Sequence, residues 1–123
     1  MTIKNANVFL HYCSFYIAGV DEVRIPLDHE LHGVVASHDC INVSALPWNE
    51  GETAITLGRF EELPPQALSP TFDGVLNTPE YRVDLFDANI PKILSIEVPD
   101  ARTRVRVWMN RSLCPDKVIV AVG

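Results

Sequence analysis

The chain has 123 residues, of which 47% are hydrophobic and 21% are charged. This length allows one domain with one core, and the composition is that of a globular protein rather than a disordered one. Ten Lys and Arg against sixteen Asp and Glu give a net charge of −6. A net negative charge disfavours a protein whose whole surface binds nucleic acid or an anionic membrane. We expect a single domain over residues 1–123, in which any basic site is local.

The N-terminal stretch MTIKNANVFLHYCSFYIAG contains an apolar run but lacks the basic flank of a signal peptide. No segment approaches the roughly 18 apolar residues that a membrane-spanning helix needs. The cysteines, Cys13, Cys40 and Cys114, are odd in number and form no CxxC motif, so neither a disulfide framework nor a zinc ribbon is encoded. We therefore expect a cytoplasmic protein with reduced thiols and no membrane partner.

Short runs rich in valine, isoleucine and aromatic residues follow one another along the chain, separated by prolines and glycines. Apolar residues nowhere recur at helical spacing over three turns. The runs predict strands at 7–17, 32–38, 40–46, 53–60, 81–87, 92–98, 102–109 and 117–122. Many short strands need a second layer to bury their faces. The sequence therefore predicts an all-β fold, an antiparallel β-sandwich of about seven to nine strands.

One of these predicted strands and two stretches between strands carry further information about the connections. The run at 7–17 is apolar on both parities, which predicts a strand that is covered on both sides or one that bends between the sheets. The sequence PWNEGE at 47–52 indicates a hairpin loop. The stretch 61–70 has too many prolines for the interior of a sheet, so we expect it to cross between sheets.

The clearest alternation lies in LSIEVPDARTRVRVWM, at 94–109. Apolar and polar residues alternate on both sides of the turn signal Pro99-Asp100, which predicts a hairpin with one apolar face. Glu97 would then lie beside Arg102 or Arg104. The predicted core consists of the apolar members of such alternations: Val83, Leu85, Leu94, Ile96, Val98, Val105 and Val107.

The opposite face of 102–109 carries an unusual set of side chains. One interpretation is a solvated outer face whose charge is offset by acidic residues of neighbouring strands. The other is a partner-binding surface, because Arg and Trp are enriched in interface hot spots and Arg pairs bidentately with carboxylates and phosphates. This predicted row consists of Arg102, Arg104, Arg106 and Trp108. Trp48, in the loop PWNEGE, is either a second exposed contact or a cap on one end of the sandwich.

The row suits an acidic protein or a phosphate-bearing ligand, and a second copy of the chain is an alternative partner. Nucleic acid is disfavoured, because the row contains a single aromatic side chain and the net charge is negative.

The stretch DHELHGVVASHDC, which ends at Cys40, contains three of the four histidines. Metal ligands must converge on one point, whereas His32 and His38 would lie about 20 Å apart on an extended strand. His38 and Cys40 share a face, and a third ligand such as His11 or Cys114 would have to come from elsewhere in the chain. Asp39 disfavours a reactive thiolate at Cys40. No GxSxG, HExxH, P-loop or GxGxxG motif occurs. We therefore expect no metal, no cofactor and no catalytic residue, with a small Cys/His or metal-dependent enzyme as the alternative.

Three segments resemble small bacterial proteins similar to competence protein J, a nuclease inhibitor. They are the opening VFLHYCSFYI, the middle HGVVASHDCINVSALPWNEGETAITL and the closing LSIEVPDARTRVRVWM, which together cover most of the chain in order. The resemblance implies a β-sandwich that binds and regulates another protein without catalysis of its own. We thus predict a non-enzymatic binding module, such as an inhibitor of a nuclease, with an oligosaccharide-binding or other ligand-binding sandwich as a further alternative.

Overall fold

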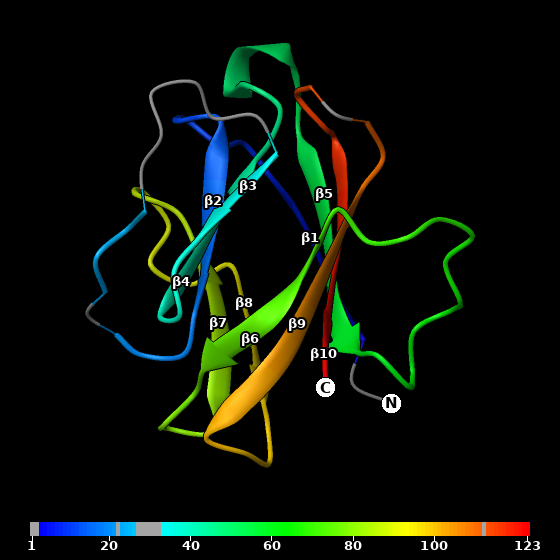
Figure 1. The fold of residues 1–123 in the computed structure, drawn as a ribbon. Helices are drawn as coiled ribbons and strands as arrows, with labels where there is room; N and C mark the ends of the chain where they lie inside the picture. The colour runs from blue at the N-terminus through cyan, green and yellow to red at the C-terminus, as the bar shows by residue number, and fades with distance from the viewer. Residues whose placement is uncertain (1–2, 22, 27–32, 112) are drawn as a thin grey trace.

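The computed structural model describes residues 3–21, 23–26, 33–111 and 113–123. Within these ranges, ten strands form two five-stranded sheets that pack face to face (Figure 1). The first sheet contains, in spatial order, β1 (Lys4–Val8), β5 (Thr53–Arg59), β10 (Lys117–Val122), β9 (Arg102–Met109) and β6 (Phe72–Asn77). The second contains β3 (Val34–Ala36), β4 (Cys40–Ser44), β2 (Ser14–Ala18), β7 (Arg82–Phe86) and β8 (Leu94–Glu97).

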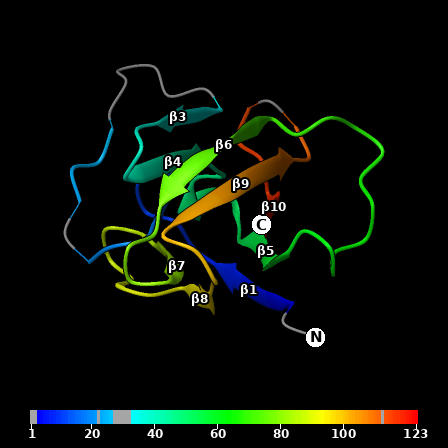
Figure 2. The same cartoon turned by 60° about the horizontal axis from the view of Figure 1, so that its bottom comes forward.

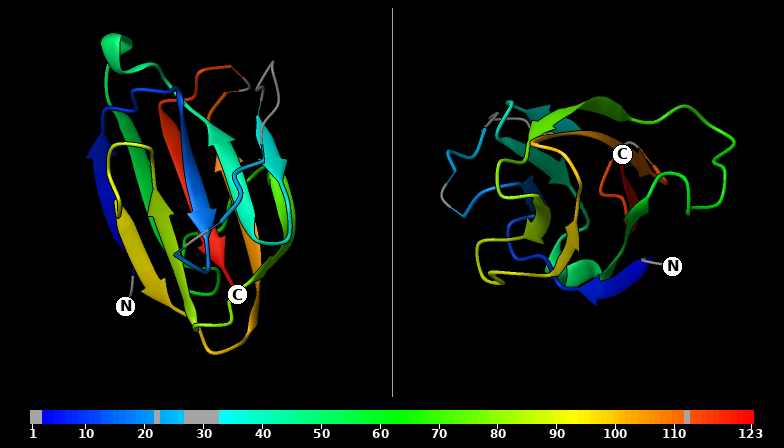
Figure 3. Two further views of the ribbon diagram at one scale, coloured as in Figure 1. Left: turned by 90° about the vertical axis from the view of Figure 1, so that its left-hand side faces the viewer. Right: turned by 90° about the horizontal axis from the view of Figure 1, so that it is seen from below.

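The structure confirms the predicted all-β antiparallel sandwich, with one strand more than the expected upper number. Among the described strands, only β5 and β10 pair in parallel. The helical content of the described residues is the short 3₁₀ helix η1 (Trp48–Glu50), and no helix among them is long and apolar enough to cross a membrane. Figure 3 shows the second sheet face-on and, from below, the two layers edge-on.

The core lies between the sheets and is built by alternate residues of the facing strands. Six of the seven predicted core residues are buried, and Leu94 is half-buried against the same cluster. Val105 and Val107 of β9 are fully buried and belong to the same cluster as Ile17 and Phe15 of the second sheet's β2. Period-2 alternation in the sequence therefore located the buried face correctly.

The predicted strand 7–17 is divided between the two sheets, which confirms the alternative of a chain that bends between them. β1 pairs with β5, and β2 pairs with β4 and β7. At the bend, Leu10 is fully buried and Cys13 has a φ of 58°, a left-handed conformation that turns the chain sharply.

The predicted hairpin of 94–98 with 102–109 is wrong. β8 pairs with β7 in the second sheet, whereas β9 pairs with β6 and β10 in the first (Figure 2). Residues 98–101 thus cross between the layers, and Glu97 lies opposite Arg82 instead of Arg102 or Arg104. The alternation is the same in either arrangement, because each strand still buries its apolar face in the shared core.

Both predictions for the longer connections are also wrong. Residues 47–52 do not close a hairpin, because they lead from β4 in one sheet to β5 in the other. Residues 60–71 do not cross between sheets; they join β5 to β6 of the same sheet and form the large loop at the right of Figure 1. β6 was not predicted, because its sequence FDGVLN contains Asp, Gly and Asn, which are rare in strands.

Candidate partner-binding surfaces

The row on β9 lies on the outer face of the first sheet. Thr103, Val105 and Val107 are buried in the sandwich, so the alternate residues of the strand point outward. The two ends of the row differ in exposure. Arg102 and Arg104 are exposed, whereas Arg106 and Trp108 are half-buried.

Arg104 forms a bidentate ion pair with Asp73 of the neighbouring strand β6. Arg104 Nε donates to Asp73 Oδ1 at 2.9 Å, and Nη2 donates to Oδ2 at 2.6 Å. This hydrogen bonding lowers the pKa of the Asp73 carboxyl and raises the pKa of the Arg104 guanidinium. Both side chains remain solvent-exposed, so the pair orients Arg104 without contributing much to stability.

The other end of the row is covered by the connection 60–71. The guanidinium carbon of Arg106 lies 3.6 Å from the centroid of the Phe60 ring, a cation–π contact. Phe60 also stacks with Trp108, with ring centroids 6.3 Å apart, and Trp108 Nε1 donates to the carbonyl oxygen of Leu68 at 2.9 Å. These contacts hold the connection against β9. The exposed apolar groups above this part of the sheet are therefore Phe60 and Leu68 rather than Trp108.

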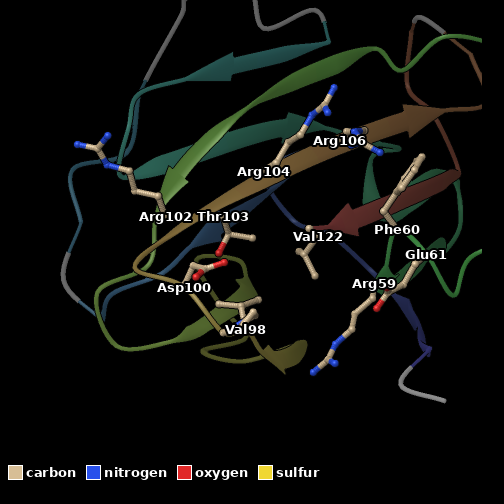
Figure 4. A pocket seen from close by; sticks show the side chains of 12 residues that line it. Arg59, Phe60, Glu61, Val98, Asp100, Arg102, Thr103, Arg104, Arg106 and Val122 are labelled. Atoms are coloured by element: carbon tan, nitrogen blue, oxygen red, sulfur yellow. The ribbon is translucent and has the colours of Figure 1, made fainter.

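A pocket of about 480 Å³ lies where β10 ends, between the start of β9 and the end of β5. Four arginines are among its lining residues, but Figure 4 shows that they do not converge. Arg102 and Arg104 point away from the pocket, and Arg59 donates to the carbonyl oxygen of Glu97 at 3.4 Å. Val98, Thr103 and Val122 lie between the arginines instead, so the arginines do not build a clamp for one small anion.

Trp48 lies apart from the row, in η1 at the end of the sandwich opposite the crossing 98–101 (Figure 1). Its indole stacks on His11, with ring centroids 5.5 Å apart and an interplanar angle of 18°. Half of the Trp48 surface, 51%, is exposed to solvent. Of the two alternatives for this residue, the structure shows an exposed aromatic at a loop tip. The sequence did not point to Tyr12 and Leu113, which are also exposed at 64% and 59%.

The alternative metal and nucleophile residues are not brought together. His38 is exposed in the turn before β4, Cys40 is fully buried, and His11 stacks on Trp48 beyond the other end of β4. Burial, with a smaller effect of the Asp39 charge, raises the pKa of the Cys40 thiol to about 11. Among the described residues, no group of three His, Cys, Asp or Glu side chains could hold a metal ion. His32 lies outside the described residues.

The fold and its surfaces define an all-β antiparallel sandwich with two separate candidate contact surfaces. No family model matches the chain, and no curated protein matches its sequence. The fold is similar to that of ComJ from Bacillus subtilis, described as an inhibitor of the DNA-degrading activity of NucA. That likeness has a TM-score of 0.64 at 15% identity, over 97% of this chain and 93% of ComJ. A second similar structure is the crocagin biosynthetic gene J product, with a TM-score of 0.50 at 12% identity, over 99% and 97% of the two chains.

Proposed function

We propose that the protein is a non-enzymatic binding module that restrains a partner enzyme, such as a nuclease, in the cytoplasm. The observation that carries this proposal is the likeness to a solved nuclease inhibitor along nearly the whole of both chains. Fold alone does not determine function, so the surface must supply the contact. We assign the first contact to the exposed end of the row.

At that end, Arg102 and Arg104 lie on β9, an interior strand flanked by β10 and β6, beside Val75 of β6. Val75 lies opposite Arg104 in register and is 50% exposed. The pair with Asp73 fixes Arg104 before any partner arrives, which reduces the entropy lost on binding. The exposed Arg102, beside the exposed aliphatic Val75 and the Arg104 that is already paired with Asp73, suits a partner surface that carries carboxylates. A second copy of the chain is the alternative occupant of this face.

The test is capture of the partner from a lysate of the source cell, with identification by mass spectrometry. The captured protein is then purified, and its activity on DNA or its own substrate is measured as this protein is added. We expect inhibition that is complete near equimolar amounts. Arg102→Glu should weaken binding at least tenfold, because it places a carboxylate against an acidic surface.

Lys92→Glu is the matched control, since it reverses an exposed charge on the connection between β7 and β8. Equal weakening by both variants would assign the effect to net charge rather than to the face. A captured enzyme whose activity is unchanged at saturating protein would contradict the inhibitory role.

A further inference from the structure

The end of the sandwich that carries η1 exposes large apolar side chains from three different connections. We call this surface the aromatic end and define it by His11, Tyr12, Trp48 and Leu113. The side chains of Tyr12, Trp48 and Leu113 are large and mainly apolar, yet more than half of the surface of each residue is exposed to solvent. Exposed aromatic residues gathered in one place are a feature of interaction surfaces.

The aromatic end has a rigid base. Leu10, fully buried, forms a parallel β-bridge with Pro47, which directly precedes Trp48. The backbone amide of Ala45 donates to the carbonyl of Cys13 at 2.8 Å, and that of Leu46 donates to the carbonyl of Pro115 at 3.0 Å. The three connections are therefore tied to one another through backbone hydrogen bonds. Aromatic rings on such a base lose little conformational freedom when a partner binds.

This end also carries negative charge. Glu50 and Glu52 are exposed next to Trp48 in the sequence and belong to the same connection. The pKa of the Cys13 thiol is raised by burial first, then by the charges of Cys114 and Glu50, so the Glu50 carboxylate acts on the neighbouring connection. Two exposed cations belong to the neighbouring part of the chain, Arg111 and Lys117 at the start of β10. Arg111 donates to the Cys114 carbonyl oxygen at 2.9 Å and lies 4.0 Å from Asp116. The charge of Arg111 is thus partly neutralised.

We propose that the aromatic end docks a basic segment of the partner protein, with a lysine or arginine side chain held against Trp48 and Tyr12 and facing Glu50. Aromatic faces attract cations, and a nearby carboxylate strengthens that preference. The same carboxylates repel nucleic acid, and the net charge of −6 disfavours a second copy of this chain as the occupant. The inference rests on the proposed function only in treating the occupant as a protein.

The experiment needs no partner. An acetylated, amidated penta-arginine peptide is titrated into the ¹⁵N-labelled protein, and the indole N–H signals of Trp48 and Trp108 are followed by NMR. The isosteric penta-citrulline peptide, which lacks charge, is the ligand control. We expect the Trp48 signal to shift and saturate with penta-arginine alone. We expect Trp48→Ala and Glu50→Gln each to weaken peptide binding about threefold to tenfold. For Trp48→Ala, which lacks the indole signal, binding is followed from backbone amide signals of the aromatic end.

Glu61→Gln is the matched control for Glu50→Gln, because it removes an exposed carboxylate from the connection 60–71. An unshifted Trp48 signal, equal binding of penta-citrulline, or equal weakening by Glu61→Gln and Glu50→Gln would each overturn the inference. The Trp108 signal should stay in place and reports that each variant remains folded. Peptide binding at this end in a protein that inhibits no enzyme would refute the proposed function and leave this inference standing.

Discussion

Replacing Val105 by Ala should destabilise the sandwich far more than the same replacement at Val75. Val105 lies in the middle of β9 and is fully buried, whereas Val75 lies on the adjacent strand and is 50% exposed. Each replacement removes two methyl groups. At about 0.8 kcal/mol for each buried carbon the loss at Val105 is about 1.6 kcal/mol, and the remaining cavity raises it to about 2–3 kcal/mol. For Val75 we expect no more than about 1 kcal/mol.

Urea unfolding followed by circular dichroism measures both losses. With the urea dependence usual for a small domain, the midpoint of Val105→Ala should fall by roughly 1–2 M without a change in slope. The Val75→Ala midpoint should move by less than half as much. Equal shifts for the two variants would refute the assignment of inner and outer faces, on which the row on β9 depends.

The buried Cys40 should resist a thiol reagent at pH 8 until the protein unfolds, while Cys13 and Cys114 react in the folded state; three equal rates would contradict the burial. Because the folded pKa of Cys40 is raised from 9.0 to about 11, its neutral thiol is favoured in the native state, so stability should fall as pH rises from 9 to 11, by on the order of 1 kcal/mol. Cys40→Ala should lack that component in urea titrations. The folded pKa of Asp73 is lowered, so its ion pair contributes stability above the ordinary pKa of an aspartate, and that stability is lost as pH falls through the folded pKa. Asp73→Asn should therefore cost less than about 1 kcal/mol at pH 7, and the cost should disappear once the pH lies below the folded pKa. Gly19→Ala should lower the thermal midpoint strongly, because its methyl group would overlap the backbone at the end of β6, and an unchanged midpoint would refute that contact.

Local pattern predicted the strands well and their partners poorly. Alternation at 94–109 identified which residues of β8 and β9 are buried, because the buried parity is the same whether a chain folds back as a hairpin or crosses to the other sheet. The choice between those arrangements depends on distant strands. The backbone amide of Val98 donates to the carbonyl of Tyr81, which continues the pairing of β7 with β8. Nothing in residues 94–109 alone indicates that partner.

The sequence predicted the direction of the side chains in the row on β9 but not their accessibility, because accessibility also depends on a distant part of the chain. The outward direction of Arg102, Arg104, Arg106 and Trp108 follows from alternation within one strand. Their accessibility depends on the connection 60–71, whose proline content predicted a loop but not the sheet face that it covers. The aromatic end joins three connections that are far apart in sequence, so no local pattern could assemble it.

The central claim is that this chain acts by binding and restraining another protein. The most direct measurement is isothermal titration of the partner captured from the source cell, performed with wild type, Arg102→Glu, Trp48→Ala and the control Lys92→Glu. The proposal predicts one binding site per partner, loss of affinity in the first two variants, wild-type affinity in the control, and partner activity that falls in proportion to the bound fraction. Turnover of a metabolite by the purified chain, with no protein retained above the level of an unrelated bait, would contradict it.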